Sequence, residues 1–378
     1  MNSEIKKITS IVTLHSKNMY TCGFNRLSMN KTLLFKLLFT GLTCIILSSD
    51  VMAQDPQFSQ FYANPLYLNP AFAGGALAPR VMMNYRNQWP GLAANYVTTS
   101  FGVDHYFSNI NSGVGLLFVN DTQGTGSLRT SEISAQYAYQ LKFNETTALR
   151  MGLQGTYANR RANLSDLTFG DQYTNRGFTG NATTDPLGSN GTPSIGYMSF
   201  STGLLLYSDK YWVGVSAHHI NRPEQAFFQV GDGTRLPIKG SLHAGLRIPY
   251  GGYTGLGDEW DREKTISPAI NYKFQGKYDQ LDLGVYITYS PIVLGLWYRG
   301  LPIKKYVDNI SNRESLIALV GYRQDKFSFG YSYDITISSL GLPSGGSHEI
   351  SLAYTFDFEP SPRTRRVKKD KQLSCPKF

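Results

Sequence analysis

Three stretches of the sequence carry residue types that bind metals or phosphate. The adjacent histidines His218 and His219 are metal-ligand types, but neighbouring side chains on a strand point to opposite faces and cannot chelate one ion. Residues 258–263 hold four acidic side chains without the ordered oxygen spacing and central glycine of a calcium loop. The Gly/Ser-rich stretch 341–347 lacks the Gly-Lys-Ser/Thr end that binds phosphate. We expect strand-end histidines, a solvated acidic turn, and no metal or cofactor.

Nucleophilic chemistry has little support in the sequence. No Gly-x-Ser-x-Gly elbow occurs, and single cysteines stand at positions 22, 44 and 375. The first two lie in a segment that we expect to be removed, so the mature chain has no disulfide framework. We expect no catalytic residue. The alternative is an outer-membrane hydrolase whose Ser and His side chains meet only in the fold.

An export signal precedes every other element. The only long apolar run, residues 33–48, has Lys31 before it and is followed by Val51-Met52-Ala53, which suits signal-peptidase cleavage. The run is shorter than the roughly 20 residues of a membrane-spanning helix. We therefore predict a signal peptide over residues 1–53, with Met29 as an alternative start. Cys44 lies inside the apolar run, which disfavours lipoprotein acylation.

Composition favours strands over helices. The chain has 37 Gly, 25 Tyr and 21 Phe, and only 17% of its 378 residues are charged. A mean hydropathy of -0.25 excludes a membrane protein of many apolar helices, but it is compatible with a barrel whose inner side is polar. Glycine and aromatic residues at this level are typical of barrel strands with aromatic girdles.

The net charge of +9 lies at the two ends of the chain. Residues 1–53 carry six basic and two acidic residues, and residues 360–378 carry seven basic and one acidic. The body between them is almost neutral, with 23 basic and 24 acidic residues over 54–359. A basic face for DNA or RNA therefore has no support, and we expect no nucleic-acid partner.

Period-two alternation runs from Arg80 to Phe358. In the final stretch of this pattern, Ile350 and Leu352 share one face while Glu349 and Ser351 share the other, which suits lipid on one side and water on the other. The sequence predicts one all-β transmembrane outer-membrane β-barrel of about 14 antiparallel strands over residues 80–358. The expected strands are 80–88, 96–107, 112–121, 127–141, 146–159, 197–208, 211–219, 240–248, 264–275, 279–290, 292–300, 314–323, 326–335 and 347–357.

Loop lengths are a separate test, because such barrels have short periplasmic turns and longer outer loops. If the first strand runs outward, the long connections 160–196 and 220–239 lie outside the cell. Two connections fit poorly: 250–263 is a long periplasmic turn and 276–278 a short outer one. A soluble β-sandwich would also show alternation and is the alternative fold.

Residues 54–79 precede the first expected strand. Proline at 65 and 70 fixes its own φ and disfavours helix at the preceding Asn64 and Asn69, so this segment cannot be a regular strand. Its apolar side chains need a surface to pack on. We expect a periplasmic strap that docks in or beneath the barrel mouth as a plug or a partner contact. The alternative is a packed strap without a partner role.

Both ends of the mature chain resemble one family. Residues 54–62 read QDPQFSQFY and residues 64–74 read NPLYLNPAFAG, which closely resembles the opening of the PorP/SprF family. That family commonly ends in a basic stretch and Cys-Pro-x-Phe, matched by CPKF at 375–378. The resemblance spans the mature chain. It implies an outer-membrane protein of the type IX secretion system of Bacteroidetes, which is a partner for secreted adhesins or for the gliding and secretion machinery.

The terminal segments carry the distinctive residues, so we place partner binding there. In the strap the candidate residues are Phe58, Phe61, Tyr62, Pro65, Tyr67, Asn69, Pro70, Phe72 and Gly74. In the tail, residues 359–378, they are Arg363, Arg365, Arg366, Lys368, Lys369, Cys375, Pro376 and Phe378. We expect both termini in the periplasm, where the basic tail meets anionic headgroups or an acidic surface of a ring or peptidoglycan-bound protein.

The expected function is therefore non-enzymatic. The chain binds and supports the secretion or surface attachment of a client such as a large adhesin, and loops on the rigid barrel carry recognition of that client. A passive porin-like channel is the alternative, because long loops and a neutral lumen also suit one. The sequence does not decide whether the lumen is open or plugged.

Overall fold

The computed structural model describes residues 55–124, 128–164, 167–185, 192–227, 235–250, 264–305 and 311–356. The predicted signal peptide, the acidic stretch 258–263 and every candidate residue of the basic tail lie outside these ranges.

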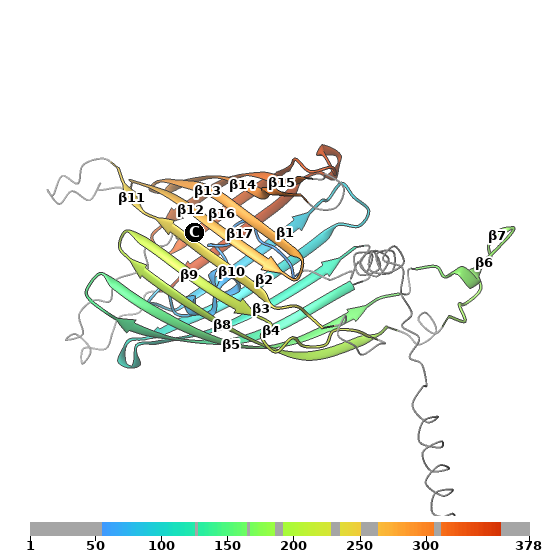
Figure 1. Ribbon diagram of the computed structural model, residues 1–378, viewed down its shortest axis with the longest axis horizontal. Helices are drawn as coiled ribbons and strands as arrows, with labels where there is room; N and C mark the ends of the chain where they lie inside the picture. The colour runs from blue at the N-terminus through green and yellow to red at the C-terminus, as the bar shows by residue number, and fades with distance from the viewer. Residues whose placement is uncertain are drawn as a thin grey trace, which may run out of the picture. The chain divides into compact units, whose positions relative to one another are not determined.

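Antiparallel strands close into a barrel (Figure 1). Its sheet has 15 strand segments, of which β11 (Ile248–Pro249) continues β10 along the same partner, so the wall is 14 strands wide. The sheet closes where β1 pairs with β17, and Arg80 lies opposite Thr355. The predicted fold class and strand number are confirmed, and the β-sandwich is excluded. The other wall strands are β1 (Arg80–Gln88), β2 (Tyr96–Phe107), β3 (Ser112–Gln123), β4 (Leu128–Lys142), β5 (Thr147–Ala162), β8 (Ser194–Ser208), β9 (Tyr211–His218), β10 (Lys239–Leu246), β12 (Lys264–Gln275), β13 (Tyr278–Tyr289), β14 (Ile292–Lys305), β15 (Ser311–Gln324), β16 (Phe327–Thr336) and β17 (Ser347–Thr355).

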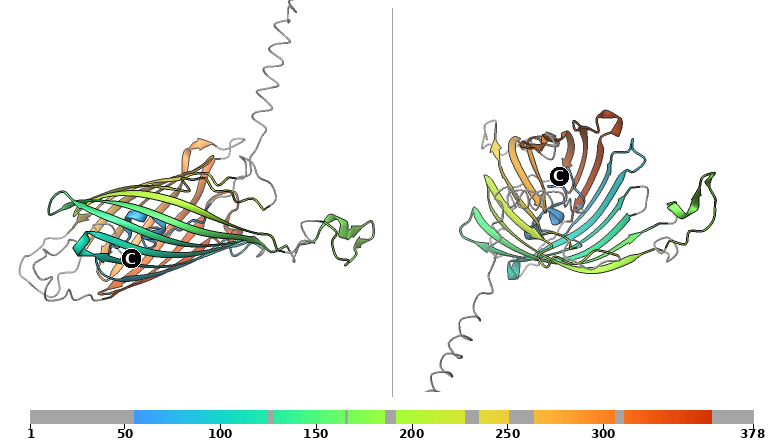
Figure 2. Two further views of the ribbon diagram at one scale, coloured as in Figure 1. Left: turned by 90° about the horizontal axis from the view of Figure 1, so that it is seen from below. Right: turned by 45° about the vertical axis from the view of Figure 1, so that its right-hand side comes forward.

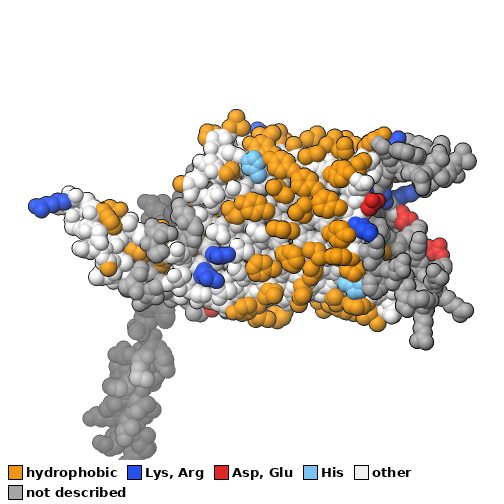
Figure 3. Space-filling model, turned by 180° about the vertical axis from the view of Figure 1, so that it is seen from behind, with side chains coloured by type: hydrophobic (Ala, Val, Ile, Leu, Met, Phe, Trp, Pro, Cys, Tyr) orange, Lys and Arg blue, Asp and Glu red, His pale blue; other side chains and the backbone are white. Residues whose placement is uncertain are grey.

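Strand alternation separates an apolar outer face from a polar inner face. In β17, for example, Ile350 and Leu352 are exposed while Glu349 and Ser351 are buried. On the face that Figure 3 shows, a band of apolar side chains spreads over much of the outer wall, which suits the hydrocarbon of a bilayer. Aromatic residues are exposed near one end of this band, as expected for an interfacial girdle. They are Phe107, Tyr211, Tyr289, Tyr322, Phe327 and Tyr354.

The two ends of the barrel differ. At the terminal end, β1 begins, β17 ends and the described connections are short: residues 108–111, 143–146, 209–210, 290–291 and 325–326. Asn111 and Asp325 take left-handed backbone conformations there, which Asn and Asp adopt more readily than other non-glycine residues. At the loop end, β5 and β8 are joined by residues 163–193, which include the hairpin of β6 (Tyr173–Thr174) and β7 (Gly177–Phe178).

Some predicted boundaries differ from the structure. Strand β14 ends at residue 305 and not at the predicted 300, and strand β15 begins at residue 311 and not at the predicted 314. Both are longer because their pairing resumes past a bulge after Arg299. Strand β9 ends at His218 because His219 has a φ of 57°, outside the strand region. The short connection 276–277 at the loop end is present, and most of the long turn 250–263 lies outside the described residues.

Residues 55–79, the luminal segment, lie inside the ring of strands (Figure 2). Two short helical turns, α3 (Pro65–Leu68) and η1 (Pro70–Phe72), each begin at a proline, whose fixed φ suits that position. Asn69 between them is extended, and its side-chain oxygen accepts a hydrogen bond of 2.9 Å from the Ala71 amide. Among the described residues, no helix has the length and apolarity needed to cross a membrane.

The segment docks inside the barrel, as one of the expected arrangements had it, and the side of the membrane that it faces stays a prediction. It runs through the lumen, from Asp55 beside Gln275 at the loop end to Gly74 beside Gly113 at the terminal end. The first described residue and the last strand residue, Thr355, therefore lie at opposite ends of the barrel. Many inward side chains of the wall are polar, and they supply the hydrogen-bond partners that a segment outside any sheet needs.

Candidate functional site

The luminal segment is held near the loop end by a buried ionic cluster centred on Ser59. The Ser59 hydroxyl donates to Asp334 at 2.5 Å and accepts from Arg299 at 3.0 Å and from Arg86. Asp334 pairs with Arg86 and Arg299, each at 3.0 Å, and Glu349 pairs with Arg86 at 3.2 Å. These charges come from four strands of one part of the wall, and the Ser59 hydroxyl bonds three of them, on β1, β14 and β16.

The backbone of the segment is bound by the same cluster. The amides of Ser59 and Gln60 donate to the Glu349 carboxylate at 2.6 and 3.1 Å. The Gln60 side chain donates to the Glu349 carbonyl at 2.9 Å and accepts from Ser351 at 2.6 Å. Breaking one member of a buried ionic cluster leaves an uncompensated charge, which costs several kcal/mol. These contacts therefore hold the backbone of the segment in one position in the lumen.

Aromatic packing continues this contact into the middle of the barrel. The ring of Phe61 lies edge-on to Trp297 at 4.9 Å between centroids, and Tyr62 lies edge-on to Trp212 at 5.6 Å. The Trp212 indole nitrogen donates to the Tyr62 hydroxyl at 2.9 Å. All four side chains are at most 5% exposed. The segment is therefore in contact with two separate parts of the wall at this level, β9 through Trp212 and β14 through Trp297.

Glycines of the wall allow the segment's backbone to come close. A Cβ at Gly152 would lie 2.3 Å from the Ala71 amide nitrogen, and one at Gly203 would lie 1.9 Å from the Asn69 side-chain oxygen. The Asn69 amide group in turn donates to two strand carbonyls, of residues 204 and 215, both at 3.1 Å. Glycine within a strand often marks close approach of another backbone, and these positions do so here.

Arg150 binds the segment near the terminal end. Its guanidinium donates to the Ala71 carbonyl at 2.9 Å, to the Ala73 carbonyl and to the Gln140 side chain at 3.1 Å. The next amide, of Gly74, donates to Asp104 at 2.8 Å. Arg150 is fully buried, so these carbonyls replace the water that the guanidinium loses.

At the loop end, Asp55 is bound by two cationic groups. Its carboxylate lies 2.8 Å from His219 Nε2 and 3.2 Å from Lys239 Nζ. Burial raises the pKa of Asp55, but His219 and then Lys239 outweigh it and hold that pKa well below its usual value. Burial lowers the pKa of His219, and Asp55 outweighs it, so the net pKa of His219 is raised. Both groups therefore stay charged around pH 6.

The described residues contain no group of three or more His, Cys, Asp or Glu side chains that would hold a metal ion. The expected arrangement of His218 and His219 on opposite faces of a strand is not found, because the strand ends at His218. Both rings are buried inside the barrel, with centroids 6.4 Å apart. What the described interior does show is a set of polar contacts to the chain's own segment.

Comparison with known proteins gives one family. The model of the type IX secretion system membrane protein PorP/SprF matches residues 51–354, which includes the luminal segment and almost the whole barrel. This chain belongs to the PorP/SprF family. The resemblance seen in the sequence is thereby confirmed. PorP/SprF proteins are secretion-system membrane proteins and not a known enzyme family.

A comparison with curated proteins gave no match. Solved outer-membrane barrels are similar in fold to this PorP/SprF chain. The toluene transporter TbuX of Ralstonia pickettii is 9% identical with a TM-score of 0.45, covering 79% of this chain and 94% of its own. TodX of P. putida is 9% identical with a TM-score of 0.43, covering 77% and 93%. Omp33 of Acinetobacter baumannii is 6% identical with a TM-score of 0.38, covering 75% and 100%. Likenesses this distant say nothing about what this PorP/SprF chain transports or binds.

The structure brings the predicted strap residues of this PorP/SprF protein together inside the lumen. Phe58, Phe61, Tyr62, Asn69 and Phe72 are at most 5% exposed. A partner reaches them only if the segment leaves the barrel, so their role in partner binding stays a prediction. The predicted tail residues, from Arg363 to Phe378, lie outside the described residues.

Sequence reasoning missed the wall residues that bind the segment. It placed Glu349 on the water-facing side of its strand, but it did not connect this residue with residues 55–79. The signal available in the sequence was the presence of charged residues on strands of the wall. A charged side chain that faces a water-filled lumen is hydrated. Arg86, Arg150 and Arg299 are instead at most 2% exposed in the structure, so they need protein partners.

Proposed function

We propose that this PorP/SprF protein is a closed, non-enzymatic outer-membrane component of the type IX secretion system that binds a secreted client. In this proposal the terminal end faces the periplasm and the loop end faces outward, following the rule that outer loops are the longer ones. The observation that carries it is the luminal segment, whose ionic and backbone contacts occupy the interior from Asp55 to Gly74. A barrel that binds its own segment so firmly is better suited to holding partners than to passing solutes.

The connection 163–193 is the best candidate for client recognition. It projects a hairpin whose tip carries Tyr173 and Phe178, 52% and 55% exposed, with ring centroids 5.4 Å apart. Hydrogen bonds within the same connection hold the two flanks of the hairpin together, because Asp171 accepts from the Thr184 amide and hydroxyl at 2.6 and 3.0 Å. Exposed aromatic pairs on a braced loop are favourable anchors for a protein partner.

The test is affinity capture of the tagged protein from solubilised outer membranes, with bound proteins identified by mass spectrometry. We expect a large secreted adhesin to be recovered with the unaltered chain and lost with the double variant Tyr173→Ser and Phe178→Ser. Leu342→Ser is the matched control, since Leu342 is a 73% exposed apolar residue on a different loop. A chain truncated after residue 359 should still recover the adhesin, but it should no longer recover periplasmic ring or peptidoglycan-bound proteins. Recovery of no client by the unaltered chain would contradict the proposal.

The porin-like alternative is tested on the same preparation. A passive channel would conduct ions steadily in a planar bilayer with the luminal segment in place. We expect the unaltered protein to remain closed. Steady conductance together with the absence of captured partners would favour the porin.

A further inference from the structure

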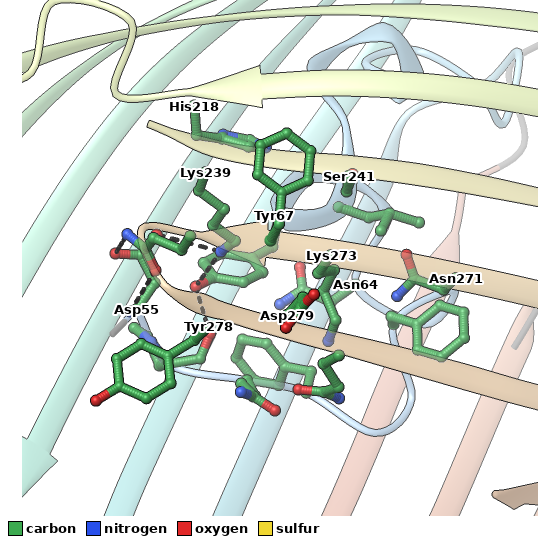
Figure 4. A pocket seen from close by; sticks show the side chains of 18 of the residues that line it. Asp55, Asn64, Tyr67, His218, Lys239, Ser241, Asn271, Lys273, Tyr278 and Asp279 are labelled. Atoms are coloured by element: carbon green, nitrogen blue, oxygen red, sulfur yellow. Dashed lines mark hydrogen bonds and ion pairs between the residues drawn. The ribbon is translucent and has the colours of Figure 1, made fainter. Parts of the chain in front are cut away.

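A cavity of about 200 Å³ lies beside the luminal segment at the loop end (Figure 4). The luminal segment contributes the aromatic side chains Phe58, Phe61 and Tyr67 to its lining. The wall strands β10, β12 and β13 contribute polar side chains, among them Lys239, Asn271, Lys273 and Gln280. The lining is therefore amphipathic, which is typical of sites for small molecules with both apolar and hydrogen-bonding groups.

Two hydrogen-bond acceptors of this lining are unused. Asn271 is 0% exposed and its amide nitrogen lies 3.5 Å from Asp282, but its oxygen has no partner among the described residues. The side-chain oxygen of Gln57 is likewise buried and has no described partner. A buried acceptor left unpaired costs about 1–3 kcal/mol, so the cavity is suited to a ligand that brings hydrogen-bond donors.

The charged groups around the cavity already have partners. Lys239 is paired with Asp55 at 3.2 Å, and Lys273 lies 3.3 Å from Asp282. Glu314 lies 3.8 Å from Arg299, and its side chain keeps 31% of its surface exposed, so solvent reaches this side of the cavity. Pairing of these charges favours a neutral ligand, because an ion would have to compete with the existing pairs.

Size and chemistry together restrict the ligand. A volume of about 200 Å³ holds several water molecules and is enough for a single ring. A pyranose ring has hydroxyl groups that donate to amide oxygens, and C–H groups on one face that pack against aromatic side chains. We propose that this cavity binds one neutral sugar unit, with Asn271 and Gln57 accepting from its hydroxyls and Phe58 and Tyr67 packing on its apolar face.

The test uses the full chain in nanodiscs, with saturation-transfer NMR and calorimetric titration. The probes are glucose, galactose, mannose and N-acetylglucosamine, each also as its methyl glycoside, which separates a free sugar from the end of a glycan. We expect at least one of these to bind with one-to-one stoichiometry. Asn271→Leu, which removes the acceptor but keeps the volume, should weaken binding at least tenfold.

Asn181→Leu, an exposed position in the loop 163–193, is the matched control and should bind the sugar as the unaltered chain does. If Asn271→Leu does not form a heat-modifiable barrel on electrophoresis, Gln57→Leu replaces it, with the same expected loss. The proposal is overturned if no sugar binds at tens of millimolar. It is also overturned if the variants bind undiminished, or if a neutral tripeptide amide binds in place of every sugar.

Discussion

The carbonyl oxygen of Ala73 lies where Gly113 of β3 would carry a side chain. A Cβ built on Gly113 would come 2.0 Å from that oxygen, far inside van der Waals contact. The wall and the luminal segment are therefore complementary in shape at the level of single atoms. Because the contact is between two backbones, neither side can relieve an added methyl group by turning a side chain.

Alanine at a glycine that faces the segment should destabilise the protein. In Gly152→Ala the new Cβ would lie 2.3 Å from the Ala71 nitrogen, and overpacking of this kind costs about 1–3 kcal/mol. Gly155→Ala on the same strand is the control, because its nearest neighbour would be 3.9 Å away. We expect the control to be neutral or more stable by about 0.4–1 kcal/mol. Urea unfolding in detergent measures both, and equal midpoints would contradict the close contact.

Neutralising the centre of the ionic cluster should be more costly. Asp334→Asn leaves the guanidinium groups of Arg86 and Arg299, both at most 2% exposed, without their shared carboxylate. Loss of one partner in a buried pair costs about 3–5 kcal/mol. Asp171→Asn, in the exposed loop 163–193, serves as control and should change unfolding little. A loss of stability no larger than that of the control would mean that Asp334 does not neutralise these arginines.

The Ser59 hydroxyl should be energetically coupled to that carboxylate. Ser59→Ala removes hydrogen bonds to charged groups, which contribute about 1.5–3 kcal/mol each. Because Ser59 and Asp334 share both arginines, the double variant should lose less than the two single variants together. A double-mutant cycle in the same urea assay measures the coupling. Strict additivity would show that the segment is not anchored through this serine.

The barrel was predictable and the contents of its lumen were not, for a physical reason. Alternation in β17 or β13 depends on the two environments that one strand separates, and it can be read from adjacent residues such as Glu349 and Ile350. The pairing of Ser59 with Glu349 joins residues 290 positions apart, and no local pattern announces it. Wall glycines such as Gly152 carried a hint, but glycine in a strand also marks bulges and bends.

The loop end of the luminal segment should respond to pH. The raised pKa of His219 means that its pairing with Asp55 contributes fully below the unfolded value of 6.5 and is lost as pH rises through the folded pKa. The lowered pKa of Asp55 contributes above 3.8 and is lost as pH falls through its folded value. Amides near Gln57 should therefore be best protected from hydrogen exchange, corrected for the intrinsic rate, around pH 5–6.

His219→Gln tests this assignment, since it removes the titrating group and keeps a hydrogen-bond donor. We expect the variant to lose the decline in protection as pH rises above 6.5, while Lys239 still pairs with Asp55. His348→Gln is the control, because His348 on β17 hydrogen-bonds Tyr331 on the neighbouring strand β16. A decline that persists in His219→Gln would assign the pH response to another group.

Removal of the luminal segment should turn a closed barrel into a conducting one. Deletion of residues 55–74 would expose a lumen lined by polar side chains such as Ser100, Gln136 and Arg150 to water, and water-filled lumens of this kind conduct ions. We expect steady conductance from the deletion in planar bilayers and none from the unaltered protein. If the deletion does not fold, Ser59→Ala combined with Arg150→Gln weakens both ends of the segment and should give brief, intermittent openings. Tyr173→Ser with Phe178→Ser, which alters only the outer hairpin, should stay closed. Equal conductance by the unaltered protein and the deletion would mean that the segment does not close the lumen.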